Sequence, residues 1–312
     1  MAQEFYLRQA YGETLVELGS ENPDIVVLDA DLSRSTRTRL FADKFPERFF
    51  NCGIAEQNMV SIAAGLAASG KIPFASTFAV FVPGRCFDQV RMSIAQPRLN
   101  VKLVVGHGGI SVGEDGTSHQ SIEDLALIGS LPGFTVIVPA DAIETAQAVR
   151  AAAAHLGPCY IRLCRPKLPL VYERSYRFKL GKAVTMRRGG DATIIALGLM
   201  VKEALEAAES LKRGGINCRV LNMPTLKPID EAAIIQAAAE TGAIVTAEEH
   251  LEHGGLGSAV ARVVATHQPV PMGLVAIKDT YAKSGKPAEL FERYGLTARD
   301  IEQAVRSAIK RK

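Results

Sequence analysis

The chain has 312 residues, of which 47% are hydrophobic and 22% are charged, and its net charge is +3. This composition is typical of a globular protein, and the length favours two domains. The small net charge argues against a nucleic-acid-binding role. No apolar stretch has the length of a membrane span. Glu4, Arg8 and Glu13 interrupt any signal-peptide pattern at the N-terminus.

The five cysteines are scattered along the chain, odd in number and without a CxxC pair. This usage indicates a reduced, cytoplasmic setting. The same spacing makes a zinc site improbable, so we expect this chain to hold no metal of its own.

The first region, residues 1–165, alternates helix-like and strand-like segments. Helices are predicted over Ala2–Leu18, Val60–Ala68 and Ile143–His155, and strands over Ile25–Asp29, Val101–Gly106, Phe134–Pro139 and Cys159–Leu163. Near-continuous apolar strands between helices predict an α/β domain, with a mainly parallel sheet and helices on both of its faces.

Residues 166–182 carry Pro166, Pro169 and several charges without a helical period, which predicts a linker. The remaining residues, 183–312, resume the alternation and predict a second, smaller α/β domain of the same class. Its strands are expected over Ala192–Gly198, Asn217–Met223, Ala243–Glu248 and Val270–Ile277, and its helices over Val201–Arg213, Asp230–Glu240 and Gly257–Thr266, with Thr297 as the N-cap of a C-terminal helix.

Charged side chains and a histidine stand at the ends of three predicted strands of the first region. Asp29 and Asp31 end one strand, His107 follows a second, and Arg165 follows a third. Ligands of open α/β sheets bind beyond the carboxyl ends of the strands. We therefore expect a ligand site in the first domain.

One carboxylate, Glu56, stands in Asn51-Cys-Gly-Ile-Ala-Glu-Gln-Asn-Met59, at the start of an apolar helix. Burying a glutamate is unfavourable unless a partner or a reaction uses it. It is either a helix-terminal residue stabilised by the helix dipole or a catalytic group. The nearby Phe74, Phe78 and Phe81 have a spacing that is common in hydrophobic cores.

The glycine-rich run from Gly106 to Gln120 follows a strand and contains His107, Asp115 and His119. Such a loop is poor core material and suits close approach of the backbone to a ligand. Its polar side chains suit a hydroxylated, phosphorylated substrate. Two arginines and a hydroxyl elsewhere, Arg8, Arg165 and Ser35, could complete a phosphate clamp.

Together, Glu56 with its helix and the segment Gly113-Glu-Asp-Gly-Thr-Ser-His-Gln120 resemble the pyrimidine-binding half of transketolase, a thiamine-diphosphate enzyme. The resemblance runs the length of the chain. It implies a thiamine-diphosphate pyrimidine-binding fold followed by the transketolase C-terminal-domain fold. It also implies that Glu56 hydrogen-bonds the cofactor's pyrimidine and favours its imino tautomer, that Phe78 and Phe81 pack around the pyrimidine, and that Asp31 lies near the cofactor.

The same resemblance assigns substrate roles. It implies that His107 contacts the phosphate end, that Asp115 reads the C2 hydroxyl, and that His119 contacts the C1 hydroxyl region of the donor. Arg8, Ser35 and Arg165 match the family's phosphate-binding positions. Gly106 and Thr117 stand where the family commonly has Thr and Pro, which leaves the fine substrate preference open.

A larger departure is the absence of the family's Gly-Asp-Gly segment, which holds Mg²⁺ and the diphosphate, since Asp115-Gly116 is the only Asp-Gly pair. Because the chain looks complete from Met1 to a C-terminal helix, we expect a split transketolase. An N-terminal, diphosphate-binding partner subunit would supply Mg²⁺, the diphosphate site and further substrate histidines, in an α₂β₂ heterotetramer with self-association.

The resulting hypothesis is a transferase of the pentose phosphate pathway. It moves a two-carbon ketol unit from a ketose phosphate of the xylulose 5-phosphate type to an aldose phosphate. One alternative is the β subunit of a 2-oxoacid dehydrogenase E1, and another is an enzyme like 1-deoxyxylulose-5-phosphate synthase. A non-catalytic regulatory or binding subunit with the same fold is the third.

A second-domain segment, His250-Leu-Glu-His253 followed by Gly254-Gly-Leu-Gly257, resembles a metal pair or a dinucleotide loop only superficially. The full glycine pattern of a dinucleotide loop is missing, and no further metal ligand stands nearby. We interpret it as a structural turn, with the following helix N-terminus as a minor anion site.

Overall fold

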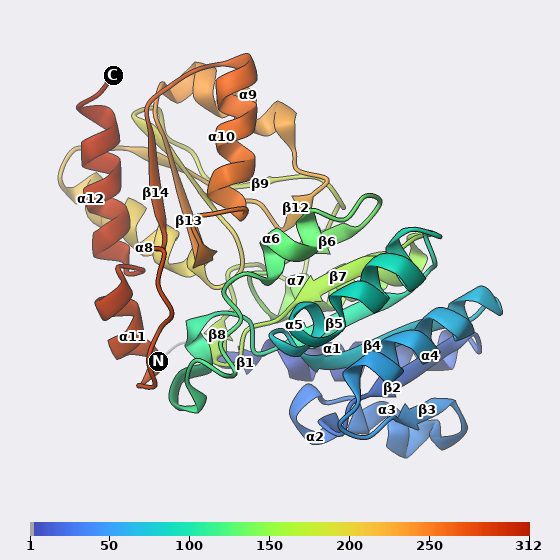
Figure 1. Ribbon diagram of the computed structural model, residues 1–312. Helices are drawn as coiled ribbons and strands as arrows, with labels where there is room; N and C mark the ends of the chain where they lie inside the picture. The colour runs from blue at the N-terminus through green and yellow to red at the C-terminus, as the bar shows by residue number, and fades with distance from the viewer. Residues whose placement is uncertain (1–2) are drawn as a thin grey trace.

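A computed structural model describes residues 3–312 and shows two α/β units in contact (Figure 1). The first sheet has seven strands in the order β12-β6-β7-β5-β4-β2-β3 within the described residues. All of its pairings are parallel except that between β12 and β6. The strands are β2 (Ile25–Asp29), β3 (Phe49–Asn51), β4 (Ile72–Phe78), β5 (Lys102–Gly106), β6 (Thr135–Ile137), β7 (Cys159–Arg162) and β12 (Thr225–Lys227).

Strand β2 shows why this sheet is covered on both faces. Ile25 and Val27 pack into one hydrophobic core with helix α1, whereas Val26 and Leu28 pack into a second core with helix α4. Alternate side chains of a strand point to opposite faces, so a continuous apolar strand needs a helix layer on each side. The first-domain helices are α1 (Leu7–Glu21), α2 (Ser33–Thr36), α3 (Arg39–Lys44), α4 (Glu56–Ala68), α5 (Phe81–Gln89), α6 (Asp124–Gly129) and α7 (Ala142–Ala154).

The second sheet has five strands in the order β14-β13-β10-β11-β9, parallel except for β9. Its strands are β9 (Val184–Arg187), β10 (Ala192–Ala196), β11 (Cys218–Asn222), β13 (Ile244–Leu251) and β14 (Met272–Ile277). Figure 1 shows α8 and α12 on one side of this sheet and α9 and α10 on the other. The helices are α8 (Met200–Arg213), α9 (Glu231–Thr241), α10 (Leu256–His267), α11 (Pro287–Tyr294) and α12 (Ala298–Ile309). The predicted two-domain α/β class is confirmed.

The N-terminal helix starts later than predicted. Helix α1 begins at Leu7, and Glu4–Tyr6 instead forms β1, which pairs with β8 (Lys167–Pro169) from the predicted linker. Ala2, the predicted first helical residue, lies outside the described residues. The two strands pair antiparallel, with Phe5 opposite Leu168. Because these partners are far apart in the sequence, the strand could not be predicted from local patterns.

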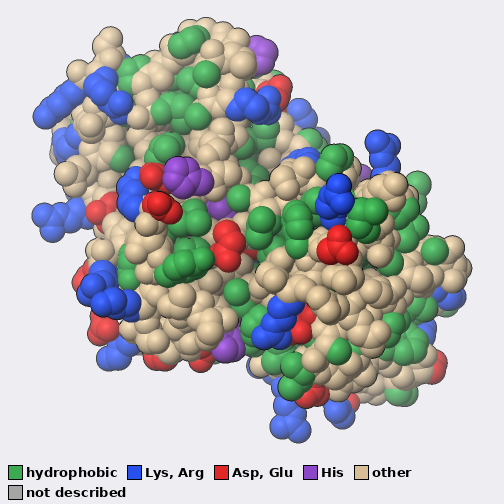
Figure 2. Space-filling model, viewed as in Figure 1, with side chains coloured by type: hydrophobic (Ala, Val, Ile, Leu, Met, Phe, Trp, Pro, Cys, Tyr) green, Lys and Arg blue, Asp and Glu red, His purple; other side chains and the backbone are tan. Residues whose placement is uncertain are grey.

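The C-terminal helix begins as predicted. Thr297 caps α12 in a capping box, because its hydroxyl accepts the Asp300 N–H while the Asp300 carboxylate accepts the Thr297 N–H. None of the helices within residues 3–312 combines the length and apolarity that crossing a membrane requires. Figure 2 shows basic and acidic side chains interspersed over the viewed face, with apolar side chains reaching the surface between them.

Candidate active site

Four aromatic rings cluster beyond the carboxyl ends of β4 and β5. Phe78 ends β4, Phe81 begins α5, and their ring centroids lie 5.8 Å apart in a stacked arrangement. His107, directly after β5, stacks on Phe78 at 3.8 Å. His119 meets the two phenylalanine rings edge-on at 6.2 and 5.5 Å. The structure therefore brings together four residues that the sequence analysis selected, whereas Phe74 is fully buried in the core as expected.

Glu56 joins this cluster through Arg85. It is the first residue of α4 and is 4% exposed. Its Oε1 accepts a hydrogen bond from Arg85 Nη1 at 2.8 Å, and the Arg85 guanidinium lies 3.8 Å from the centroid of the Phe81 ring. The sequence analysis missed Arg85. Its position four residues after Phe81 on one helix, which places both on one helical face, was the available signal.

His107 is a buried histidine in an unusual backbone conformation. Its φ is 61°, in the left-handed region, and its Nδ1 is buried without a hydrogen-bond partner among the described residues. Burial, reinforced by the positive charges of Arg8 and Arg165, lowers the pKa of His107 to about 3. The imidazole is therefore neutral at pH 7, and its buried Nδ1 has unmet hydrogen-bonding capacity.

Two arginines, Arg8 and Arg165, lie near His107, and a third, Arg37, lies near Arg8. Arg8 lies on α1, Arg37 follows α2, and Arg165 follows β7. Burial lowers the pKa of Arg8, and the neighbouring charges of Arg37 and Arg165 lower it further. The Nε atoms of Arg8 and Arg37 are buried without a hydrogen-bond partner in residues 3–312. Neighbouring guanidinium groups whose N–H donors lack partners are typical of a site that binds an anion.

Arg37 was missed by the sequence analysis, and Asp29 explains how it is placed. The buried Asp29 carboxylate accepts hydrogen bonds from Leu32 N–H at 2.5 Å, Thr36 Oγ1 at 2.7 Å and Thr38 Oγ1 at 2.8 Å. These bonds shape the turn on which Arg37 adopts a φ of 69°. A left-handed arginine after a four-residue helix leaves no periodic signal in a sequence.

The other predicted site residues also lie in the first domain. Ser35 is half-buried on α2, two residues before Arg37. The exposed Asp31 exchanges hydrogen bonds with Asn51, its carboxylate accepting from Asn51 Nδ2 at 3.1 Å. Asp115 is exposed at the end of the 3₁₀ helix η3 (Ile110–Asp115). Arg165 donates to the Val112 carbonyl at 2.6 Å and so ties itself to the same loop. In residues 3–312, no group of three or more His, Cys, Asp or Glu side chains could hold a metal ion.

Two domain families match the chain. Residues 3–171 match the pyrimidine binding domain of transketolase, and residues 181–301 match the transketolase C-terminal domain. The chain therefore belongs to the transketolase family, and it corresponds to the C-terminal section of that enzyme. The family is generally dependent on thiamine diphosphate.

Curated relatives support the same assignment. The chain is 46% identical to a putative transketolase C-terminal section from Methanocaldococcus jannaschii, over 98% of this chain and 96% of that protein. It is 43% identical to the 6-deoxy-6-sulfo-D-fructose transketolase subunit SqwH of a Clostridium species, over 99% of this chain and 96% of that protein. Human transketolase is 42% identical over 97% of this chain, which spans 49% of the human protein.

Solved structures agree with the sequence comparisons. A split gene transketolase, described as an inactive β4 tetramer, has a TM-score of 0.93 at 53% identity and covers 99% of both chains. Transketolase from Leishmania mexicana has a TM-score of 0.83 at 25% identity, with 100% of this chain and 46% of that chain covered. The fold thus corresponds to about half of a single-chain transketolase.

Proposed function

We propose that this chain is the pyrimidine-binding subunit of a split transketolase, active only with a partner subunit. The complex transfers a two-carbon ketol unit from a ketose phosphate of the xylulose 5-phosphate type to an aldose phosphate. The observation that carries the proposal is the continuous cluster from Glu56 through Arg85, Phe81, Phe78 and His107 to the arginines.

The cluster fits the aminopyrimidine of thiamine diphosphate. When bound, this cofactor supplies a nucleophilic carbon that takes up the two-carbon unit. The Phe78 and Phe81 rings would give the pyrimidine an apolar wall, and we assign Asp31 to the edge of this site. Arg85 engages Oε1 of Glu56. The second oxygen of that buried carboxyl would remain to hydrogen-bond the far ring nitrogen of the pyrimidine.

The cationic end of the site fits the terminal oxyanion of the sugar. Arg8, Ser35 and Arg165 hold this group, and Arg37 adds a third guanidinium. The neutral His107 donates or accepts a hydrogen bond without adding charge. His119 contacts the C1 hydroxyl region and Asp115 the C2 hydroxyl. We assign His119 a catalytic role in proton relay at the C1 hydroxyl, and His107 a catalytic role through its hydrogen bond to the phosphate end of the substrate.

A second candidate substrate has a sulfonate in place of the phosphate. The Clostridium relative, 43% identical, is described as a subunit acting on 6-deoxy-6-sulfo-D-fructose. Phosphate and sulfonate are both tetrahedral oxyanions that arginines bind through paired N–H donors. The same three arginines could therefore serve either sugar, and a direct comparison of the two donors decides between them.

A partner of the N-terminal type completes the proposal. The chain lacks the Gly-Asp-Gly segment, so the partner would hold Mg²⁺ and the diphosphate. Apolar side chains beside Glu56 are exposed, Ile54 by 79%, Phe50 by 40% and Ile62 by 37%, which suits a protein partner. We propose an α₂β₂ heterotetramer in the cytoplasm, where the five cysteines, free in the structure, would stay reduced.

The test is a reconstitution. The chain is pulled down from its source organism, its partner is identified by mass spectrometry, and the complex is assayed with thiamine diphosphate, Mg²⁺, xylulose 5-phosphate and ribose 5-phosphate. Formation of sedoheptulose 7-phosphate supports the proposal, and Glu56→Gln should abolish most turnover while Glu47→Gln, an exposed control, leaves it unchanged. A complex that requires pyruvate or a lipoyl protein would overturn the reaction, and full activity of Glu56→Gln would overturn the role of Glu56.

A further inference from the structure

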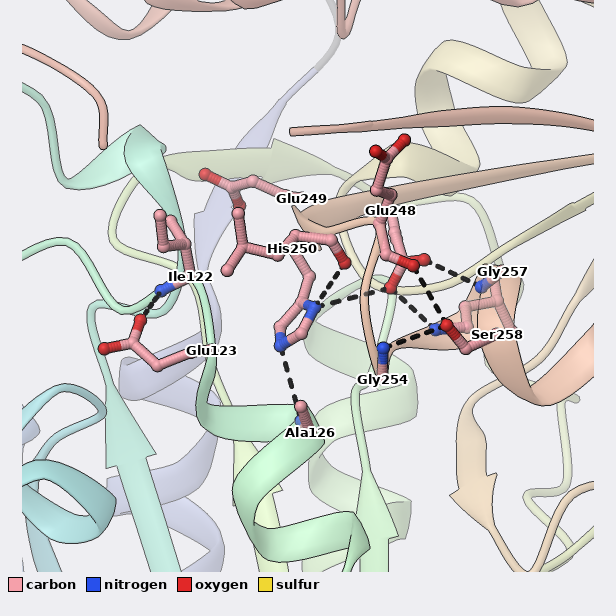
Figure 3. A network of polar contacts seen from close by, with 12 residues as sticks. Ile122, Glu123, Ala126, Glu248, Glu249, His250, Gly254, Gly257 and Ser258 are labelled. Carbon is pink, nitrogen blue, oxygen red and sulfur yellow. Dashed lines mark hydrogen bonds and ion pairs between the residues drawn. The ribbon is translucent and has the colours of Figure 1, made fainter. Parts of the chain in front are cut away.

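The segment Glu248–Gly257 joins the second domain to the first (Figure 3). The Glu248 carboxylate accepts the N–H groups of Leu256 and Gly257, at 2.7 Å each, and so caps helix α10. The buried His250 ring accepts the Ala126 N–H through Nε2 at 3.4 Å. Glu248, Glu249 and His250 are consecutive polar residues of this segment. The contacts of Glu248 lie inside the second domain, and those of His250 reach the first domain.

Glu249, between Glu248 and His250, points to the glycine-rich loop Gly106–Gln120 of the first domain. Its Oε1 accepts the backbone N–H of Ser111, and its Oε2 is buried without a partner among the described residues. Gly109, with a φ of 83°, lies directly against this carboxyl, since an added Cβ would clash with the carboxyl carbon of Glu249. The loop therefore lacks a side chain at the point where Glu249 enters it.

The loop is held by the second domain on another side as well. Thr117 Oγ1 donates to the Ala282 carbonyl at 2.5 Å, and Gln120 Nε2 donates to the Lys283 carbonyl at 3.1 Å. The loop leaves the ring cluster at His107 and returns to it at His119. Its middle, where Ser111 lies, is thus anchored by a residue of the second domain.

We propose that Glu249 is a positioning residue of the site: by accepting the Ser111 N–H it fixes the loop that carries His107 and His119. The inference rests on the proposed function for its effect on substrate, although the loop itself is observed directly. Glu249 acts on the loop as a hydrogen-bond acceptor.

The neighbouring Arg162 has hydrogen-bond partners other than the Glu249 carboxylate. Arg162 Nε donates to Asp124 at 2.9 Å, and its Nη2 donates to the carbonyls of Ser121 and Glu249 at 3.0 Å each. Arg162 thus hydrogen-bonds another carboxylate, and its charge also favours the ionised form of Glu249. Burial outweighs this effect and raises the pKa of Glu249 to about 7. A protonated carboxyl still accepts through its carbonyl oxygen, as an amide does.

Two nearly isosteric variants separate these roles. Glu249→Gln keeps an acceptor for Ser111, whereas Glu249→Met fills the same volume without one. Glu252→Gln is the matched control. Glu252 lies on the same segment as Glu249, but it pairs with Lys278 at 2.8 Å and not with the loop. In the full chain alone, amide hydrogen exchange of residues 109–113 should accelerate about tenfold or more in Glu249→Met and stay within about threefold in Glu249→Gln.

In the reconstituted complex, Glu249→Met should raise the KM for the ketose about tenfold or more, and Glu249→Gln should restore it. Unchanged exchange in Glu249→Met, or equal exchange in the two Glu249 variants, would overturn the proposal. If amide exchange behaves as expected but the complex has no transketolase activity, the positioning of the loop is supported and the proposed function is refuted. The two ideas therefore fail separately.

Discussion

Arg85 links the carboxylate of Glu56 to the ring of Phe81. Its Nη1 lies 2.8 Å from Glu56 Oε1, while the guanidinium carbon Cζ lies 3.8 Å from the centroid of the Phe81 ring. Phe81 is in turn stacked on Phe78. A salt bridge, a cation–π contact and an aromatic stack therefore run in series, and each orients the next.

The first prediction is a coupling energy between Glu56 and Arg85. Arg85→Met keeps the packing of the side-chain stem but leaves the buried Glu56 carboxylate without its donor, which should cost about 1–3 kcal/mol of unfolding free energy. In a Glu56→Gln background the same change should cost less. Urea denaturation of the four chains in a double-mutant cycle measures the difference, and a coupling near zero would show that the contact does not stabilise the chain.

The second prediction concerns pH and His107. The pKa of His107 is about 3 in the folded chain, against about 6.5 when unfolded, so only the unfolded chain binds this proton in between. Stability should fall as the pH drops below 6.5, by about 2 kcal/mol at pH 5 from this group. His107→Phe keeps a ring on Phe78 and cannot titrate. Denaturation at pH 7.5 and 5.0 should show a smaller loss in this variant, and an equal loss would contradict the assignment.

The third prediction tests the three arginines without any activity assay. Inorganic phosphate should raise the thermal midpoint of the full chain, because a ligand that binds only the folded state stabilises it. Arg37→Met should remove most of this rise. Arg39→Met is the control, since the exposed Arg39 pairs with Asp43 on α3. If phosphate shifts Arg37→Met and Arg39→Met equally, Arg37 is not part of an anion site.

The fourth prediction concerns the turn that carries Arg37. Asp29→Asn replaces one acceptor oxygen by a donor that faces the hydroxyls of Thr36 and Thr38. The free energy of unfolding should fall by about 1–3 kcal/mol, and the phosphate-induced stabilisation should fall with it. Asp43→Asn serves as the exposed comparison. A stable Asp29→Asn chain with full phosphate response would show that the turn does not depend on this carboxylate.

Much of the fold follows from local patterns. The apolar run Ile25–Asp29, with turn residues on both sides, predicts a buried strand whose alternate side chains feed two cores, and that is what β2 does. The Thr297 cap is equally local, because all of its partners lie within one helical turn. By contrast, β1 exists because it pairs with β8, far along the chain. Local patterns do not contain this information, and the prediction of a helix over residues 4–6 was therefore wrong.

The candidate site divides in the same way. His107 and His119 stand in a glycine-rich loop that a sequence can single out, and the rings of Phe78 and Phe81 come with it through the family resemblance. Arg37 and Glu249 could not be found, because their importance comes from neighbours distant in sequence. Glu249 meets Ser111, which lies 138 positions away in the chain. Neither residue has a motif of its own.

Strand β12 lies in the second region but completes the edge of the first sheet, antiparallel to β6. A hinge motion between the two domains would have to break this strand pairing, together with the Val138 N–H bond to the Pro224 carbonyl at 2.8 Å. The shared strand therefore restrains relative motion of the two domains. In the proposed complex, substrate entry and release would then depend on surface loops or on the docking subunit more than on an opening between these domains.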